Sequence, residues 1–496
     1  MSINENYIDE IWKIIKDKNE LDKFTESCRN PLKKSIKINL NKISVERFKE
    51  ITKNWKWEIT DPWFIKTNKI PNDSYYIDRE DIEFALGKSF LHMSWLFYIQ
   101  EIAAWMPARF LDIKEWDLIL DISAAPWWKS SQIWDYLLYK EWNPWFVIAN
   151  DVNWKRIQTL AHNLNRMWIY NSGVSKLNWF VFWKNLWEIF DHILVDAPCS
   201  WEWIWFKSDF SLKTWKKQEI NKISWTQFQL LVSAIKSCKE WWTIVYSTCT
   251  MNPYENEENV AKILDFFKWA IELENVEINW KSYWISSIEE DGEEKTILDK
   301  EEAKKIARFR PHIQNTWGFF IAKFKKVKSL KDKYKVIENK IAPKNPFKID
   351  ISKWIQKQIS KFLEDNYWIK INKSKHMFFA TNKKVYLTSS KFMEIKDHIN
   401  FEKVGVPILK FGWTSKLVPL HWLGNILWDI ASKNFIELDD KEMQDYAELQ
   451  DLYIDEERIN KNNIKDREYL IIKYLGMWMW VGKLIDWRIK NKYIKI

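Results

Sequence analysis

Short apolar runs alternate with amphipathic stretches over residues 85–325. Each run spans five or six residues and ends at a turn, and the runs cover 118–122, 146–151, 192–196, 243–247 and 319–324. Short apolar runs of this length are typical of buried strands, and strands that alternate with helices indicate a doubly wound sheet. The pattern therefore predicts an α/β fold with a mainly parallel sheet, including a helix over 155–166.

The flanking regions have different patterns. Residues 1–84 combine an amphipathic helical start with a strand-like run at 35–40, which predicts a small N-terminal α/β accessory region. Residues 327–350 are Lys-rich and contain Ala-Pro-Lys-Asn-Pro at 342–346, which indicates a linker. Short strand-like runs then predict a C-terminal α+β extension over 351–496. The central domain is therefore expected over 85–326.

Acidic and polar residues follow the first two predicted strands of the central domain. The segment Asp121 to Lys129 lies between a strand and a helix, and Asp151 ends the next strand. Ligands of doubly wound sheets bind at the carboxyl ends of the strands, where an acidic residue commonly holds ribose hydroxyls. Asp151 alone could equally cap a helix. Together with the preceding loop, it favours a site for an adenosine-bearing cofactor.

Two cysteines follow the next two strands. The segments are Asp-Ala-Pro-Cys-Ser at 196–200 and Ser-Thr-Cys-Thr at 247–250, so Cys199 and Cys249 are expected on one rim of the sheet. A thiolate is a good nucleophile once its pKa is lowered. The alternative is that each cysteine is a small buried hydrophobe, which is our interpretation of Cys28 and Cys238.

Tryptophan and glycine occur in inverted proportion, with 36 tryptophans and 9 glycines among 496 residues. Globular proteins usually contain roughly 7% glycine. Several tryptophans stand in turns that normally need glycine, at 127, 128, 201, 203, 241 and 242. We therefore hypothesise that most are glycines in the natural protein, encoded by UGA codons that the organism reads as glycine. A truly tryptophan-rich chain, with a blocked ligand loop at 127–128, is the alternative.

Charge and cysteine usage narrow the class of protein. Lysine and arginine number 77 against 68 acidic residues, a net charge of +9 that permits a polyanionic partner without requiring one. The four cysteines have no CxxC spacing, so no metal site is predicted and a reduced cytoplasmic compartment fits. The chain shows neither a signal-peptide pattern nor an uncharged apolar stretch of membrane-spanning length. We expect a monomer with no membrane partner.

These motifs resemble the Nop/Sun-type RNA cytosine-5 methyltransferases, most closely the RsmF branch of bacterial ribosomal RNA enzymes. With tryptophan read as glycine, the cofactor loop becomes Ser-Ala-Ala-Pro-Gly-Gly-Lys and the catalytic loops become Asp-Ala-Pro-Cys-Ser-Gly-Glu-Gly and Tyr-Ser-Thr-Cys-Thr. Segments 97–101, 253–257 and 316–320 also match. The resemblance is strong over 85–325. The basic C-terminal end resembles the family's PUA-like RNA-binding extension, although a solvated Lys-rich surface is the alternative.

The resemblance implies S-adenosylmethionine as methyl donor and a cytosine in RNA as acceptor, with 16S ribosomal RNA as the expected substrate. Cys249 would be the nucleophile, Cys199 would assist product release, and Asp196 would face both the cytosine and the donor. Asp151 would hold the donor's ribose. The rest of the donor would be wrapped by Ser123, Ala124, Ala125, Pro126, Trp127, Trp128 and Lys129.

Other interpretations stay open at this stage. The family usually has an adenine-contacting aspartate near the third strand, but segment 182–186 contains no acid, so either Asn185 substitutes or the alignment shifts there. The substrate could be tRNA, or the chain could be a non-catalytic RNA-binding assembly factor. A DNA cytosine methyltransferase would use Cys199 as the nucleophile, and a nucleotide-dependent dehydrogenase would leave both cysteine loops unexplained.

Overall fold

The structure is a computed structural model of the chain. It describes residues 5–40, 42–62, 64, 73–80, 85–93, 95–125, 129, 133, 145–167, 169–200, 217–278, 284–290, 292–331, 333–334, 351–412, 417–420, 423, 433–448, 450–462 and 464–491. Pro126, Trp127, Trp128, Trp201 and Trp203 lie outside the described residues.

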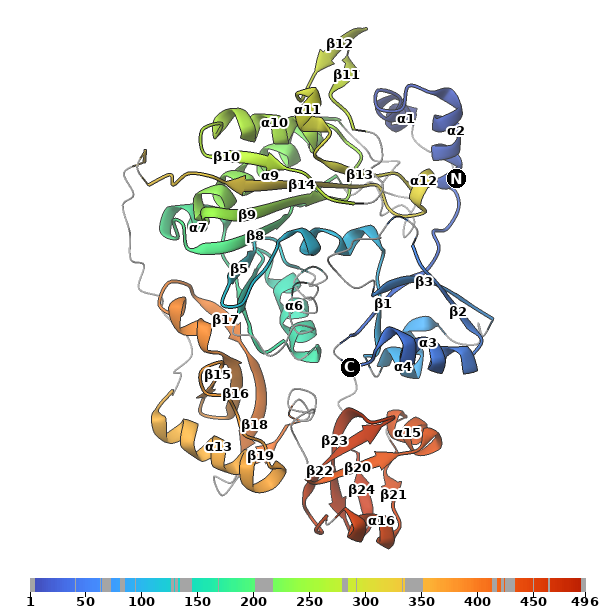
Figure 1. Cartoon of the computed structure of the whole chain (residues 1–496), viewed down its shortest axis with the longest axis vertical. Coiled ribbons are helices and arrows are strands. Elements are labelled where there is room, and N and C mark those ends of the chain that lie inside the picture. Colours follow the sequence, from blue (N-terminus) through green and yellow to red (C-terminus); the bar gives the residue numbers. More distant parts are fainter. Residues whose placement is uncertain are drawn as a thin grey trace.

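A nine-stranded sheet forms the centre of the described structure (Figure 1). Its strand order is β10-β14-β9-β8-β5-β6-β7-β17, with β13 paired to β14, and the strands from β9 to β7 are parallel. The other strands pair antiparallel to their neighbours. The strands are β5 (Leu118–Asp121), β6 (Phe146–Asn150), β7 (Ser172–Ser175), β8 (Phe190–Asp196), β9 (Cys238–Thr248), β10 (Ile271–Glu274), β13 (Ala307–Phe309), β14 (Phe319–Lys326) and β17 (Phe401–Val404). All five apolar runs fall on strands of this sheet.

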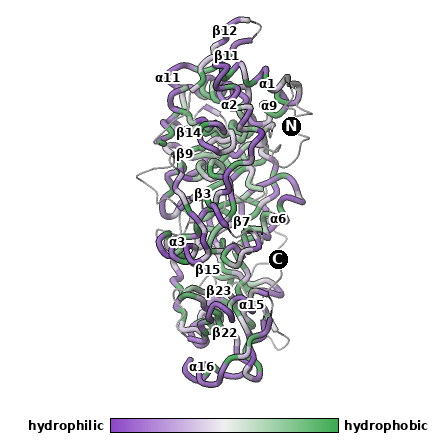
Figure 2. The backbone as a smooth tube through the Cα atoms, turned by 90° about the vertical axis from the view of Figure 1, so that its right-hand side faces the viewer, coloured by the Kyte–Doolittle hydropathy of each residue, from purple (hydrophilic) through white to green (hydrophobic). Residues whose placement is uncertain are grey.

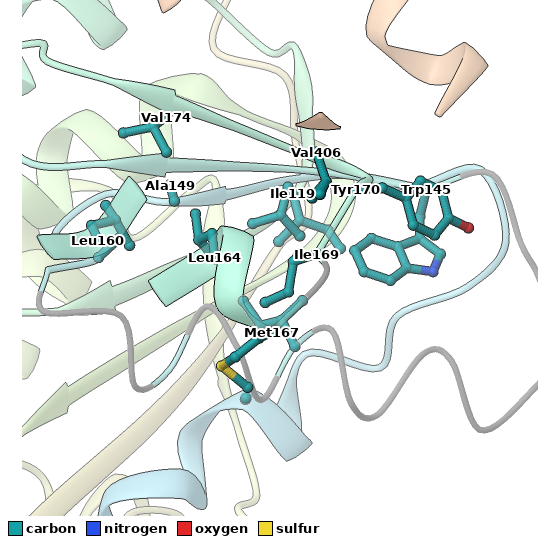
Figure 3. Close-up of a cluster of buried hydrophobic side chains, with 14 of the residues drawn as sticks. Ile119, Trp145, Ala149, Leu160, Leu164, Met167, Ile169, Tyr170, Val174 and Val406 are labelled. Carbon is teal, nitrogen blue, oxygen red and sulfur yellow. The ribbon is translucent and has the colours of Figure 1, made fainter. Parts of the chain in front are cut away.

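Side chains that alternate along the strands supply two separate cores. On β6, Val147 and Ala149 join one buried cluster, whereas Phe146 and Ile148 join the other. Helix α6 packs on the first face (Figure 3), and the second face is covered by α7, α9 and α10. These helices are α6 (Trp154–Arg166), α7 (Trp179–Asn185), α9 (Lys217–Ser237) and α10 (Glu257–Phe266). Apolar burial on both faces is what a doubly wound sheet requires, so the predicted α/β fold is confirmed.

The N-terminal region forms its own antiparallel sheet, ordered β2-β3-β1-β4. Its apolar side chains share one cluster with the C-terminal sheet, in which Ile36 and Phe97 pack with Ile436 and Leu470. The elements before the central sheet are α1 (Glu5–Trp12), α2 (Lys18–Ser27), β1 (Ser35–Ile38), α3 (Val45–Asn54), β2 (Trp57–Thr60), β3 (Ser74–Arg79), α4 (Phe90–Met93) and β4 (Phe97–Ile99). Short elements inserted between β10 and β14 are β11 (Ser287–Glu290), β12 (Glu293–Thr296), α11 (Lys300–Ala303) and α12 (Pro311–Gln314).

Two further sheets follow residue 350. The first is ordered β15-β16-β18-β19, and the second is ordered β20-β22-β23-β24-β21. The first group comprises α13 (Lys353–Tyr367), β15 (His376–Ala380), β16 (Lys384–Ser389), β18 (Val406–Phe411) and β19 (Leu417–Pro419). The second comprises β20 (Phe435–Leu438), α15 (Asp440–Ala447), β21 (Leu452–Tyr453), α16 (Glu456–Lys461), β22 (Tyr469–Tyr474), β23 (Met477–Ile485) and β24 (Arg488–Lys490). The region after residue 350 therefore has the predicted α+β character.

The C-terminal region also completes the central sheet. Strand β17 pairs antiparallel with the edge strand β7, and Val406 beyond it joins the core beneath α6 (Figure 3). Gly173 permits this close approach, since a Cβ there would lie 2.5 Å from the Phe401 ring. Gly405 turns the chain with a φ of +60°, and a Cβ there would lie 2.2 Å from the Leu387 carbonyl oxygen. Both positions therefore require glycine.

Hydrophilic segments lie at the two ends of the molecule in the view of Figure 2, around β11–β12 and α16. Among the described residues, we find no helix with the length and apolar character that crossing a bilayer demands.

Glu101 joins two segments that are far apart in the sequence. Its carboxylate accepts hydrogen bonds from the Thr316 hydroxyl, from the backbone N–H of Trp317 at 3.1 Å and from that of Ala104 at 3.1 Å. These bonds tie the segment after β4 to the entry of β14. Burial outweighs the backbone hydrogen bonds and raises the pKa of Glu101 from 4.5 to about 7.

Among the described residues, five tryptophans adopt the left-handed backbone conformation that favours glycine. They are Trp95, Trp116, Trp241, Trp368 and Trp487, with φ between 56° and 70°. A side chain in this region costs roughly 1–2 kcal/mol because its Cβ crowds the following carbonyl oxygen. Their backbone conformation supports the hypothesis that glycine occupies these positions in the natural protein.

We predict that Trp241→Gly stabilises the chain and that Trp225→Gly destabilises it. Both side chains are similarly exposed, at 63% and 64%, but Trp241 has a φ of 70° whereas Trp225 lies inside α9. Relief of backbone strain should raise stability by about 0.5–1 kcal/mol, while a mid-helix glycine should lower it by a similar amount. Thermal unfolding midpoints measure both changes. Equal effects of the two substitutions would contradict the prediction.

We predict that Glu101→Gln weakens the pH dependence of stability. The folded-state pKa of about 7 lies above the unfolded value of 4.5, so the folded chain holds this proton more tightly. The stabilisation by protonated Glu101 is therefore full below pH 4.5 and is lost as the pH rises through 7, by about 3 kcal/mol in total. Unfolding midpoints at pH 5 and pH 8 should differ less in the variant than in the parent. An unchanged difference would show that Glu101 is not the titrating group.

Candidate active site

The parallel pairing of β8 and β9 brings the two cysteine loops to the same rim of the sheet. Asp196 lies opposite Ser247 in the strand register. The Ser247 hydroxyl donates to Asp196 Oδ1 at 3.0 Å, and the N–H of Ala197 donates to the Ser247 carbonyl oxygen at 3.0 Å. The loops that follow β8 and β9 therefore begin side by side at the same edge of the sheet.

The Sγ atoms of Cys199 and Cys249 are 2.9 Å apart. Cys199 is buried and Cys249 is partly exposed. Helices α1 and α2 reach this rim, where Tyr7 and Phe24 belong to an apolar cluster against which Cys249 packs. The structure thus brings together the two cysteines that the sequence places on separate loops. Cys28 and Cys238 are buried.

Lys129 and Asp196 form an ion pair across the rim. The Lys129 ammonium contacts Asp196 Oδ1 and lies 4.9 Å from the centre of the Phe319 ring. Lys129 is buried, whereas about a third of the Asp196 side chain is exposed. This contact links the loop after β5 to the loop after β8. The Asp196 carboxylate is therefore held in place by Lys129 and Ser247 and still reaches solvent.

The loop after β5 lies beside the end of β6. The N–H of Ala124 donates to the Asn150 carbonyl oxygen at 2.7 Å, and the Arg156 guanidinium donates to the Ala125 carbonyl oxygen. Ser123, Ala124 and Ala125 are the described members of the predicted donor loop before Lys129. Pro126, Trp127 and Trp128 lie outside the described residues, so a blocked loop stays a prediction.

Asp151 is buried at the end of β6 and does not cap α6. The helix cap is Asn153, whose backbone N–H donates to Asp151 Oδ1 at 2.8 Å. Arg156 Nη1 lies 3.4 Å from Asp151 Oδ2. A carboxylate beside a loop of small residues fits a ribose-bearing donor, since carboxylate oxygens accept hydrogen bonds from both ribose hydroxyls.

Asn150 organises three strand ends, a role that the sequence pattern does not reveal. Its Oδ1 accepts from the Ser175 hydroxyl at 2.9 Å and from the Leu177 N–H at 2.8 Å. Its Nδ2 donates to the carbonyl oxygens of Ile122 at 3.1 Å and Leu177 at 2.9 Å. The only sequence signal is a polar residue that ends an apolar strand next to Asp151.

Asn185 does not occupy the end of the third strand. That strand is β7, which ends at Ser175, whereas Asn185 lies at the C-terminal end of α7. A connecting helix runs back across the sheet, so its C-terminus lies away from the carboxyl ends of the parallel strands. The position of Asn185 favours the second option, a shift of the alignment, and the adenine-contacting residue stays unassigned.

Family models match two consecutive parts of the chain. Residues 108–325 match the model of the 16S rRNA methyltransferase RsmB/F, and residues 3–102 match the N-terminal domain of the 16S rRNA methyltransferase RsmF. Ribosomal RNA small subunit methyltransferase F of Vibrio campbellii is 28% identical over 99% of this chain and 96% of its own length. The protein of the same name from Erwinia tasmaniensis is 27% identical, over 98% and 95%.

Solved structures share the fold. A methyltransferase homologue from Pyrococcus horikoshii superimposes with a TM-score of 0.52 at 25% identity, over 62% of this chain and 90% of that one. NSun6 from Pyrococcus horikoshii, solved with SFG, gives a TM-score of 0.52 at 22% identity, over 64% and 97%. Two successive family models and relatives aligned along nearly the whole chain point to one family, and the protein belongs to the RsmB/RsmF family of S-adenosylmethionine-dependent ribosomal RNA methyltransferases.

Proposed function

We propose that this protein methylates carbon 5 of a cytosine in RNA, with 16S ribosomal RNA as the substrate, through a covalent Cys249–cytosine adduct. The observation that carries the proposal is the meeting of two cysteines, 2.9 Å apart, on the rim that also holds Asp196. The curated relatives are named as small-subunit ribosomal RNA methyltransferases, which supports the choice of RNA.

The nucleophile is needed because carbon 5 of cytosine is too electron-poor to attack a methyl group. The Cys249 thiolate adds to carbon 6, and the displaced electron pair makes carbon 5 nucleophilic. Bound S-adenosylmethionine supplies the methyl group. After transfer, a base removes the carbon 5 proton, the electron pair re-forms the ring double bond, and the bond between Cys249 and carbon 6 breaks.

Asp196 and Cys199 assist different steps. The Asp196 carboxyl group hydrogen-bonds the ring nitrogen and the exocyclic amine as charge shifts there. Lys129 and Ser247 hold that carboxyl group in one orientation. The Cys199 thiol lies within hydrogen-bond distance of the Cys249 sulfur, so it can stabilise the thiolate that leaves in the release step.

The donor site is assigned to the loops after β5 and β6. The loop 123–129 would wrap the methionine and ribose portions, and Asp151 would hold the ribose hydroxyls. Asn150 supports this assignment, since its hydrogen bonds fix the neighbouring strand ends. Asp196 lies between the donor loop and the cysteines, because Lys129 of that loop contacts its carboxylate.

The target cytosine must leave its base stack to reach Cys249. Single-stranded or looped RNA meets this requirement with the smallest unstacking cost. The basic C-terminal region would hold RNA phosphates and make affinity salt-dependent. A tRNA substrate and a non-catalytic assembly factor are the alternatives that the following experiment separates from the proposal.

We predict that RNA containing 5-azacytosine traps a covalent adduct that depends on Cys249. Trapping should use 16S ribosomal RNA and, in parallel, tRNA. Cys249→Ala should abolish the adduct and lower methylation by at least about a thousandfold, because no other step activates carbon 5.

Cys199→Ala should retain the adduct, and Cys238→Ala is a matched control at the opposite end of β9. An adduct that needs Cys199 instead would indicate the DNA-enzyme arrangement, and no adduct with the parent protein would indicate an assembly factor.

We predict that peroxide joins Cys199 to Cys249. Their sulfur atoms are 2.9 Å apart and need to approach by only about 0.9 Å to reach the roughly 2.05 Å of a disulfide bond. The two thiols give two electrons and two protons to one peroxide molecule, which leaves as two waters. Burial raises the pKa of Cys238 to about 12, so that thiol should not react. Thiol titration should fall by two and methylation should cease, and a dithiol reductant should restore both. Loss of activity without a Cys199–Cys249 crosslink in peptide mass spectra would contradict the prediction.

A further inference from the structure

We propose that Gln227 and Glu255 are positioning residues that hold the Cys199 loop in place for product release. The inference rests on the proposed function, in which Cys199 assists the departure of Cys249 from the methylated base. Neither residue belongs to the predicted site, and both are fully buried. Gln227 lies on α9, and Glu255 lies between the Cys249 loop and α10.

The two side chains bind the chain on both sides of Cys199. Glu255 Oε2 accepts from the backbone N–H of Ser200 at 3.0 Å and from Gln227 Nε2 at 2.7 Å. Gln227 Nε2 also donates to the Pro198 carbonyl oxygen at 2.8 Å. The residues immediately before and after Cys199 are therefore fixed by one pair of side chains.

The pair is itself held rigidly. Asn259 Nδ2 donates to Gln227 Oε1 at 3.0 Å and to the Glu255 carbonyl oxygen at 3.1 Å. The Tyr246 hydroxyl donates to the same carbonyl oxygen at 2.6 Å. Side chains of β9, α9 and α10 thus converge on one point behind the cysteines. Hydrogen bonds inside a dry core permit little displacement, because each unmade bond leaves a buried polar group unsatisfied.

The Cys249 loop has supports of its own, although the Ser200 hydroxyl also donates to the Thr250 hydroxyl at 3.1 Å and so joins the two cysteine loops. The Thr248 hydroxyl donates to Asn256 Oδ1 at 2.5 Å, and Asn256 Nδ2 donates to the Thr250 carbonyl oxygen at 2.9 Å. Removal of the Gln227 amide therefore loosens the loop of Cys199 but leaves the bonds on both sides of Cys249. Attack and methyl transfer should be nearly unchanged, whereas release should slow.

The test is Gln227→Met in the full-length protein, with 16S ribosomal RNA from cells that lack the enzyme. Methionine keeps the length of the side chain and removes both hydrogen-bond donors. We expect the steady-state rate to fall roughly tenfold, while single-turnover methyl transfer stays within about threefold of the parent rate. Because release is the slowed step, a methylated, denaturant-resistant protein–RNA adduct should accumulate. A general loss of structure would lower both rates together.

Ser233→Ala is the matched control. Ser233 is a buried residue of the same helix, and its hydroxyl donates to the Trp179 carbonyl oxygen at 2.7 Å. Among the described residues, this hydroxyl bonds neither the Cys199 loop nor Asn259, so the variant should release product as the parent does. Equal adduct accumulation in Ser233→Ala, or none in Gln227→Met, would overturn the proposal.

A second variant covers the case in which Gln227→Met does not fold. Gln227→Met combined with Glu255→Met replaces both buried polar partners and removes the carboxylate that loses its Gln227 donor in the single variant, which typically restores stability. It should show the same adduct. If the parent protein forms no Cys249-dependent adduct with 5-azacytosine RNA, the proposed function is wrong. If that adduct forms but release is normal in a folded variant, only the positioning role is wrong.

Discussion

The in-register parallel pairing of β8 with β9 is the constraint on which the site depends. Strands of a parallel sheet that run side by side end at the same edge, so residues far apart in the sequence emerge together. Asp196 and Ser247 occupy opposite register positions, and the cysteine three residues after Asp196 meets the one two residues after Ser247. A slip of one residue would turn every following side chain to the other face of the sheet.

The sequence predicts this arrangement because parallel strands end at the same edge of a sheet, even when they are far apart in the sequence. Apolar runs locate the five main strands, and their shared edge then predicts that Cys199 lies near Cys249. Strand β7 escapes detection because Ser172–Ser175 is short and half polar, which also explains why the adenine-contacting residue stays unassigned. The boundaries proposed for the four regions stay predictions, as do the roles of the site residues.

Side chains that support the site from behind are less visible in the sequence. Gln227 lies in an amphipathic helix and resembles an ordinary polar position, yet it is fully buried behind Pro198. Asn150 ends a strand beside Asp151 and resembles an ordinary polar strand end, yet it binds both the segment after β5 and the segment at the end of β7. Such roles depend on which atoms face one another after folding, and residue spacing carries no information about that.

Because β17 lies late in the chain, the central sheet gains its last edge strand only near the end of synthesis. Until Phe401–Val404 leaves the ribosome, β7 has one side without its final strand, and an uncovered edge strand readily pairs with other chains. The β7 edge of the nascent central sheet therefore stays uncovered until β17, which lies far downstream in the sequence, has been synthesised. A chain cut short before residue 401 should consequently be lost to aggregation or degradation, so RNA would meet mainly enzymes whose C-terminal region has already been made.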